Sequence, residues 1–197
     1  LFTEAKKKIQ VQEQELNKKD MLINNIIRKI GDNHTTNNIS INMFLNDKCK
    51  NALNFSEFIQ KIEISTNDLE NNAQLGFVNG ITKIFMDNLQ QLTPFERPIH
   101  CTDIKREIVY IKDNNTWQKE HEILIDNGIQ EVSRKSISSL LQWKKENPEY
   151  KNMDSDFSNK CIVIQRHSTA MINKHKLYPK IRHNIARKNY LKLHSLK

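Results

Sequence analysis

Apolar residues recur at helical spacing over long stretches of the chain, and this periodicity is the strongest constraint on its fold. Between Leu75 and Leu92 they fall three or four residues apart, as on the buried face of a helix. The same spacing returns at Ile123 and continues until Pro148 ends it. Only four of the 197 residues are glycine. Because glycine destabilises helix interiors, its scarcity favours helices. The sequence predicts a mainly helical α+β fold, with a helix-rich domain over residues 38–157.

Residues 1–31 have the pattern of a coiled coil. Apolar residues recur every seven positions, the spacing that keeps one seam facing a partner helix: Phe2, Ile9, Leu16, Ile23 and Ile30. The other seam position is poorer, because it includes Gln12 and Lys19. We expect a dimerisation helix that makes the protein a homodimer. The alternative is an amphipathic helix that lies on its own domain.

A β-hairpin is predicted within the stretch ERPIHCTDIKREIVYIKDNNTWQKE, residues 96–120. Residues 107–112 favour a strand, residues 113–115 form a turn signal, and residues 116–119 return as the second arm. Residues 98–102 add a short strand. We expect Tyr110 and Trp117 to pair across the hairpin. The residues expected to build this structural motif are Arg97, His100, Asp103, Arg106, Tyr110 and Trp117.

The same stretch is rich in chemically active residues, but their arrangement does not favour catalysis. His100 and Cys101 are neighbours, so on a strand they point to opposite faces and do not converge on one metal ion or form a nucleophile–base pair. A magnesium-dependent nuclease built from Glu96, Asp103 and Lys105 is an alternative. No glycine-rich phosphate loop is present, which argues against nucleotide hydrolysis. From the arrangement of these residues we expect a non-enzymatic protein with no catalytic residue, no metal site and no cofactor in this chain.

Positive charge is concentrated at one end of the chain. Residues 158–197 hold ten of the 31 Lys and Arg, four His and no acidic residue. Such a segment is expected to bind polyanions. We interpret it as a basic helical tail, with Pro179 at the first position of its last helix. The alternative is a solvated surface, or a tail that docks on its own domain.

The basic tail supplies the candidate nucleic-acid-binding residues. Lys and Arg neutralise phosphates, and tyrosine rings can stack on the bases of a single strand. The candidates are Arg166, Lys174, Lys176, Tyr178, Lys180, Arg182, Arg187, Lys188, Tyr190 and Lys192. DNA or RNA is therefore the expected partner.

The three cysteines have no paired spacing, so neither a disulfide framework nor a zinc ribbon is predicted. No apolar run approaches the roughly 20 residues of a membrane span, and the first residues do not resemble a secretion signal. We expect an intracellular protein that is not secreted and not in a membrane.

Two segments, INMFLNDKCKNALNFSEFI (residues 41–59) and PFERPIHCTDIKREIVYIKDNNTWQKE (residues 94–120), resemble a family of uncharacterised proteins of giant, large-genome DNA viruses. The resemblance covers about residues 39–150 and rests on ERPIHC and D-x-KR ahead of a hairpin with Tyr, Lys and Trp. It implies a virus-infected host cell, and a two-cysteine, two-histidine zinc finger before the coiled coil. This chain departs from that pattern, since it contains no C-x-x-C. The resemblance implies no catalytic residue.

These patterns together predict a nucleic-acid-associated viral protein, either a DNA-binding regulator or a genome-organising factor, that acts as a dimer. A protein–protein adaptor or virion structural component, with a viral protein as its partner, is the main alternative. The nuclease is the second.

Overall fold

A computed structural model describes Glu15, residues 41–120 and residues 122–191. The chain divides into two compact units, Leu1–Phe44 and Leu45–Lys197. The five seam residues Phe2, Ile9, Leu16, Ile23 and Ile30 lie outside the described residues, so the predicted dimerisation helix stays a prediction. In the first unit, Ile41 is helical.

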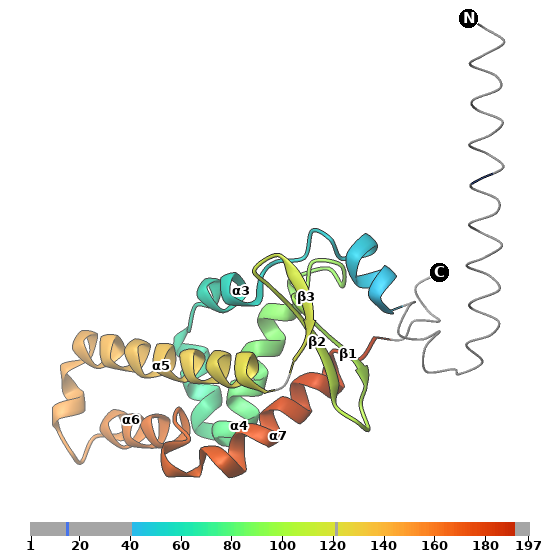
Figure 1. The fold of residues 1–197 in the computed structure, drawn as a ribbon. Helices are drawn as coiled ribbons and strands as arrows, with labels where there is room; N and C mark the ends of the chain where they lie inside the picture. Colours follow the sequence, from blue (N-terminus) through green and yellow to red (C-terminus); the bar gives the residue numbers. More distant parts are fainter. Residues whose placement is uncertain (1–14, 16–40, 121, 192–197) are drawn as a thin grey trace, which may run out of the picture. The chain divides into compact units, whose positions relative to one another are not determined.

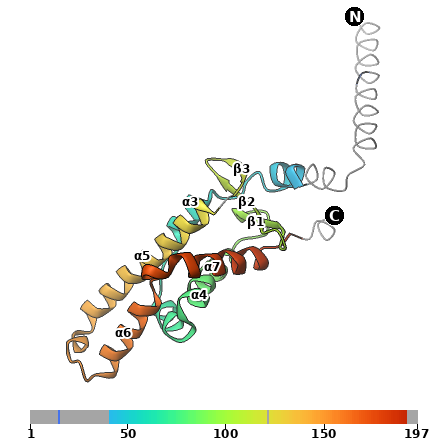
Figure 2. The ribbon, with the colours of Figure 1, turned by 60° about the horizontal axis from the view of Figure 1, so that its bottom comes forward.

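The second unit is mainly helical with one small sheet, as predicted (Figure 1). Its α-helices are α3 (Phe55–Lys61), α4 (Thr66–Gln90), α5 (Ile123–Glu146), α6 (Asp156–His167) and α7 (Lys174–Lys188). A π-helical turn lies at Phe44–Lys48, and 3-10 turns lie at Pro148–Lys151 and Met171–Asn173. Figures 1 and 2 show the sheet at one end of the helices and α6 at the other.

The sheet consists of β1 (Ile99–Asp103), β2 (Ile108–Asp113) and β3 (Thr116–Lys119), antiparallel and in the order β1-β2-β3. The sheet therefore contains the expected hairpin, β2–β3, and β1 at the place of the short strand predicted over residues 98–102. Asn114 and Asn115, which join β2 to β3, both have positive φ, at 48° and 61°. Two such residues make the hairpin turn whose twist suits the flanking strands. The Asp-Asn-Asn signal is thus confirmed as the turn.

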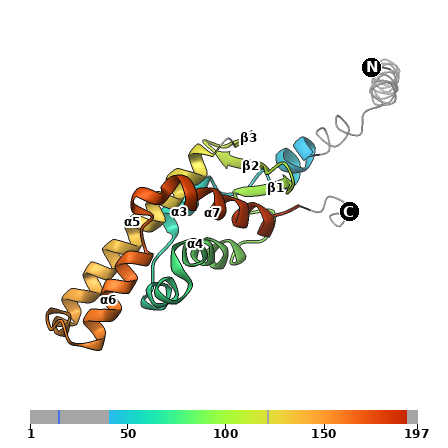
Figure 3. The same cartoon turned by 90° about the horizontal axis from the view of Figure 1, so that it is seen from below.

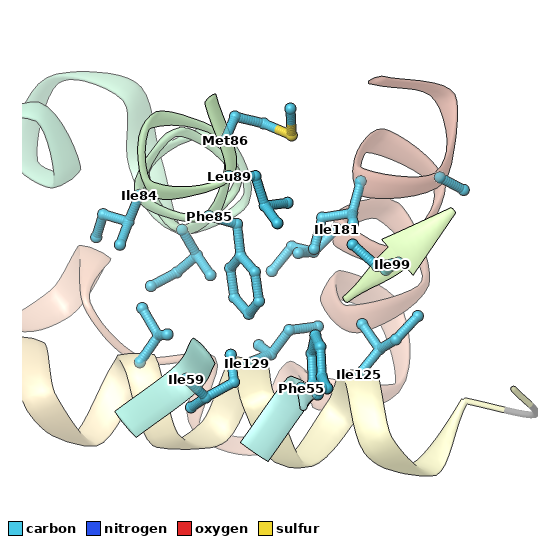
Figure 4. Close-up of a cluster of buried hydrophobic side chains, with 14 of the residues drawn as sticks. Phe55, Ile59, Ile84, Phe85, Met86, Leu89, Ile99, Ile125, Ile129 and Ile181 are labelled. Atoms are coloured by element: carbon cyan, nitrogen blue, oxygen red, sulfur yellow. The ribbon is translucent and has the colours of Figure 1, made fainter. Parts of the chain in front are cut away.

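Phe85 of α4 lies at the centre of the main core (Figure 4). It is fully buried, and its ring centroid lies 6.5 Å from that of Phe55 in α3. Side chains from α5, α7 and β1 close the cluster, including Ile129, Ile181 and Ile99. In α4, α5 and α7, helical periodicity directs the apolar residues to one face, and Ile99 of β1 meets them there, which is why the segments fold together.

A smaller core joins α6 to α4 and α5. Leu69, Leu140, Cys161 and Ile164 are buried in it. Trp143 and Phe157 pack edge to face on it, with ring centroids 5.0 Å apart and planes at 84°.

Helix α4 begins at a capping box and bends at a glycine. The Ser65 hydroxyl accepts a hydrogen bond from the Asp68 backbone N–H at 3.2 Å, and the Asp68 carboxylate accepts one from the Ser65 N–H at 2.9 Å. Gly76 has φ 73° and ψ 171°, which interrupts the helix. After the bend, Gly80 lies against Asn72: a Cβ on Gly80 would lie 3.0 Å from the Asn72 Cα. Glycine is therefore required at residue 80 for this close approach.

The basic segment is not an appended tail between residues 158 and 191. Tyr178, Ile181, Ile185 and Ala186 of α7 belong to the main core, and the ring of Tyr178 stacks on Phe77 of α4 with centroids 6.2 Å apart. Figures 2 and 3 show α7 alongside α4. Pro179, predicted at the first helical position, lies inside α7, which begins at Lys174.

The chain after α7 extends the sheet. The Cys101 N–H donates to the Asn189 carbonyl at 2.9 Å, and the Leu191 N–H donates to the Cys101 carbonyl at 2.8 Å. These two bonds make a parallel bridge between Cys101 and Tyr190 along β1. The last described residues thus cover the outer edge of β1 at this point.

Candidate nucleic-acid interface

Helix α7 has two distinct faces. Its buried face carries Tyr178, Ile181 and Ile185, whereas the residues at positions 176, 180, 183 and 187 are exposed. These four positions are separated by four, three and four residues, so they follow one side of the helix. We call Lys176, Lys180, His183 and Arg187 the α7 basic stripe. With a rise of 1.5 Å per residue, it is about 16 Å long.

The fixed charges of the α7 basic stripe are not neutralised by the described part of the chain. Lys176, Lys180 and Arg187 form no ion pair with any described residue. His183 is different, because its Nδ1 lies 2.6 Å from Oε1 of Glu107. Three fixed positive charges therefore face solvent along one side of a rigid helix.

Arg182 does not belong to this exposed side. Its guanidinium contacts Asp126 at 2.7 Å and Glu122 at 3.1 Å, and its side chain is only 13% exposed. Because two carboxylates already bind this guanidinium, it is not available to a phosphate. Arg182 fixes α7 to the start of α5 and is removed from the candidate phosphate contacts.

Tyr178 is removed for a similar reason. It is 5% exposed, and its ring contacts Phe77, so it has no face left for a base. Burial also raises the pKa of its hydroxyl group. Tyr190 remains a candidate, because it is 42% exposed.

The other predicted tail residues are dispersed. Arg166 is exposed on α6, and Lys174 contacts Gln130 of α5 at 3.3 Å and lies over the Tyr178 ring at 5.8 Å. Lys188 is exposed in the last turn of α7, and Lys192 lies outside the described residues. Cations in the last turn of a helix interact favourably with the helix dipole, so Arg187 and Lys188 also stabilise α7.

A groove of about 450 Å³ lies between α4 and α7 next to this stripe. Its walls consist of Leu75, Asn79, Thr82, Lys83, Met86, Asp87 and Gln90 from α4 and Asn184, Arg187 and Lys188 from α7. Arg187 belongs to both the α7 basic stripe and the groove, so the two features are continuous.

The predicted motif around the sheet is structural. His100 is 3% exposed, its ring centroid lies 5.6 Å from that of Trp117, and its Nε2 lies 3.7 Å from the Cys49 sulfur. Burial lowers the pKa of His100 to about 4 and raises the pKa of the Cys49 thiol to about 11. Both groups are therefore neutral near pH 7, so the pair contains neither a thiolate nor a charged imidazole. Cys101 points to the opposite face, into the main core.

Three of the motif residues have roles that differ in detail from those expected. Trp117 is opposite Lys112, not Tyr110, and Tyr110 is opposite His100 and Lys119. Arg97 donates to the Leu89 carbonyl at 2.9 Å, so it caps the end of α4 instead of the hairpin. Asp103 does stabilise the β1–β2 turn, where its Oδ1 accepts from the Arg106 N–H at 3.0 Å.

The carboxylates of the nuclease alternative have local partners. Glu96 accepts from the hydroxyl and the N–H of Thr93 at 2.7 and 3.0 Å, which lowers the pKa of its carboxyl group. Within residues 41–120 and 122–191, no three His, Cys, Asp or Glu side chains gather in a way that would hold a metal ion.

Sequence reasoning missed two buried or partly buried lysines that act as caps. Lys112 is 5% exposed, and its Nζ donates to the carbonyls of Lys50 and Ala52 at 2.6 and 2.8 Å. The Nζ of Lys135 donates to three carbonyls at the end of α3, those of Ile59, Gln60 and Ile62. Neither lysine has a sequence pattern that distinguishes it from a solvent-exposed lysine.

Comparison with protein-family models, curated proteins and solved structures found no match to this chain. Among the helices that are described, none is long and apolar enough to cross a membrane.

Proposed function

We propose that this protein is non-enzymatic and binds nucleic acid through the phosphates. The observation that supports this function best is the α7 basic stripe, which presents Lys176, Lys180 and Arg187 on one exposed side of a helix. A row of unpaired cations attracts a polyanion, and counterion release supplies affinity that does not depend on sequence. The fixed geometry of α7 keeps the three charges in line.

Dimerisation through residues 1–31 is part of the proposal and is based on the seven-residue apolar spacing. Two weak phosphate-binding faces held together gain effective concentration, so the dimer binds more tightly than either face alone. A regulator or genome-organising factor of a giant DNA virus is the setting that the resemblance favours.

The test is a salt series with short duplex and single-stranded DNA and RNA. The parent protein is compared with a triple variant, Lys176→Gln, Lys180→Gln and Arg187→Gln. If each of these side chains neutralises one phosphate, the log–log salt slope of the variant is smaller by about two to three. Affinity at low salt falls with it.

A matched control removes the same charge elsewhere. Lys61, Lys145 and Lys151 are exposed and lie away from α7 in sequence. Changing these three to Gln leaves the slope nearly unchanged if binding is local to the stripe. Equal loss in both triple variants would mean that only net charge matters, and an unchanged slope in the α7 variant would overturn the proposal.

A protein–protein adaptor is a second candidate, favoured by exposed apolar side chains on and after α6. Ile162 is 53% exposed, Met171 62% and Ile172 88%. Under this candidate function, Ile162→Ser together with Ile172→Ser abolishes binding to a viral protein partner in the absence of nucleic acid. The salt series with nucleic acid is then unchanged by these substitutions.

A further inference from the structure

The walls of the groove between α4 and α7 are partly apolar, unlike those of a site that binds only phosphate. Leu75 and Met86 give it an apolar part, and Leu75 is 44% exposed. Its volume of about 450 Å³ lies in the range of small-molecule pockets. An apolar part beside polar groups suits a flat ring with polar edges.

The charges at the groove favour an anionic ligand. Lys83 and Asp87 neutralise one another, since Nζ and Oδ2 lie 2.6 Å apart. Arg187 and Lys188 form no ion pair with a described residue, so a net positive charge remains at the α7 wall. Arg187 is also the last residue of the α7 basic stripe. A phosphate held there lies directly beside the groove.

The groove wall also contains three amide side chains, which a ligand that consists of phosphate alone would not require. Asn79, Gln90 and Asn184 each carry a donor and an acceptor, and a nucleobase edge presents both. Asn79 makes one weak hydrogen bond, from Nδ2 to the Leu75 carbonyl at 3.5 Å, and its Oδ1 has no described partner. The side chain of Asn184 forms no hydrogen bond within the described residues. These amides are therefore available to a ligand.

We propose that the groove receives one unstacked base of a single strand whose phosphates lie on the α7 basic stripe. This inference rests on the proposed function and specifies its ligand. A paired base in a duplex is stacked and has its Watson–Crick edge occupied, so it does not reach the groove. The groove walls carry no aromatic ring, so the base is held by its edge and by contact with Met86 and Leu75.

The experiment uses single strands of DNA and RNA that contain one 2-aminopurine, whose fluorescence is quenched by stacking. We expect the fluorescence to rise several-fold on binding, and the single strand to bind more tightly than the duplex of the same length. The DNA and RNA arms show which sugar is accepted. No rise in either arm would overturn the inference.

Two groove variants, Asn79→Leu and Asn184→Leu, test the residues. Each is expected to weaken single-strand binding about tenfold and to suppress the fluorescence rise, with duplex affinity and the salt slope unchanged. Gln74→Leu is the matched control, because Gln74 is exposed on α4 and is not part of the groove wall. Thermal unfolding of each variant verifies that it folds.

The outcomes separate the two proposals. If the groove variants bind single strands as well as the parent while the stripe variant loses its salt slope, the base site is wrong and the phosphate site stands. If the stripe variant keeps its slope, the proposed function fails, and the base site fails with it.

Discussion

The protonation state of His100 is set by its surroundings. The ring is enclosed by Trp117 and Cys49, and water that would solvate an imidazolium is excluded. The charge of Arg97 further lowers the pKa. His100 is therefore a neutral packing residue whose titration is linked to folding.

We expect the second unit to lose stability on acidification because of His100. The pKa of His100 is lowered from 6.5 to about 4, so between these values the unfolded chain binds a proton that the folded protein does not. Stability is fully present above the unfolded pKa and is lost as the pH falls, by up to about 3 kcal/mol. Denaturant unfolding across this range measures the loss. The variant His100→Gln, which does not titrate there, is expected to have a flatter pH profile, and identical profiles would contradict this.

Lys112 is a buried cation that completes a loop. Its ammonium group donates hydrogen bonds to the carbonyls of Lys50 and Ala52. These carbonyls lie in a segment without regular backbone hydrogen bonding. Lys112→Met keeps most of the apolar stem and removes both hydrogen bonds. We expect a loss of about 1–3 kcal/mol in the free energy of unfolding, because two carbonyls lose their partner. Urea unfolding provides the measurement. Lys119→Met is the control, since Lys119 is exposed on β3, and it is expected to change stability by less than about 0.5 kcal/mol.

At the scale of the element, α4 depends on one backbone angle. Gly76 has φ 73° and ψ 171°, a region that is open almost only to glycine. No atom lies within 4 Å of a Cβ built on Gly76, so a substitution there is opposed by the backbone alone. We expect Gly76→Ala to cost about 1–3 kcal/mol. Gln74→Ala, two residues earlier in the same helix, is expected to be nearly neutral, and thermal unfolding of the pair tests the difference. Equal stability would mean that α4 straightens without cost.

Sequence patterns predicted the elements better than their ends. The helices α4 and α5 follow from apolar spacing, and the β2–β3 turn follows from consecutive Asp and Asn residues, because both signals are local. The register across the sheet does not follow, since a shift of two residues decides whether Trp117 is opposite Tyr110 or Lys112, and both lie on the same face of β2. Pro179 lies inside α7, although proline is typical of the first position of a helix. The buried face of α7, with Tyr178 and Ile181, compensates for the hydrogen bond that proline removes.

At the scale of the whole molecule, the number of charges in the sequence did not predict that α7 packs into the main core. Ten positive charges and no acid over residues 158–197 predict a basic tail, because composition records residues and not the face of the helix on which each lies. Tyr178, Ile181 and Ile185 of α7 are only three or four residues apart, and Phe77, the partner of Tyr178, is far away in sequence. The stripe residues were predictable as cations. Only the fold shows that Tyr178 is buried and that Arg182 is partly buried and paired with two carboxylates.

We therefore expect a chain that ends at Phe157 to be unfolded. It lacks the side chains from α6 and α7 that fill both cores, including Ile164, Ile181 and Ile185. Circular dichroism and thermal scans are expected to show loss of a cooperative transition. The triple Gln variant of α7 controls for charge, since it keeps the buried face and is expected to retain a cooperative unfolding transition. A folded fragment that ends at Phe157 would contradict this assignment of the core.

The hydrogen bond from Asn189 Nδ2 to Met86 Sδ joins residues 103 positions apart in the chain. During synthesis, α4 leaves the ribosome long before its partner helix exists. At about 5–20 residues per second, the apolar side of α4 waits on the order of ten seconds for α7. We therefore expect the nascent protein to be prone to aggregation, and to benefit from a chaperone, in the interval between the translation of these two helices.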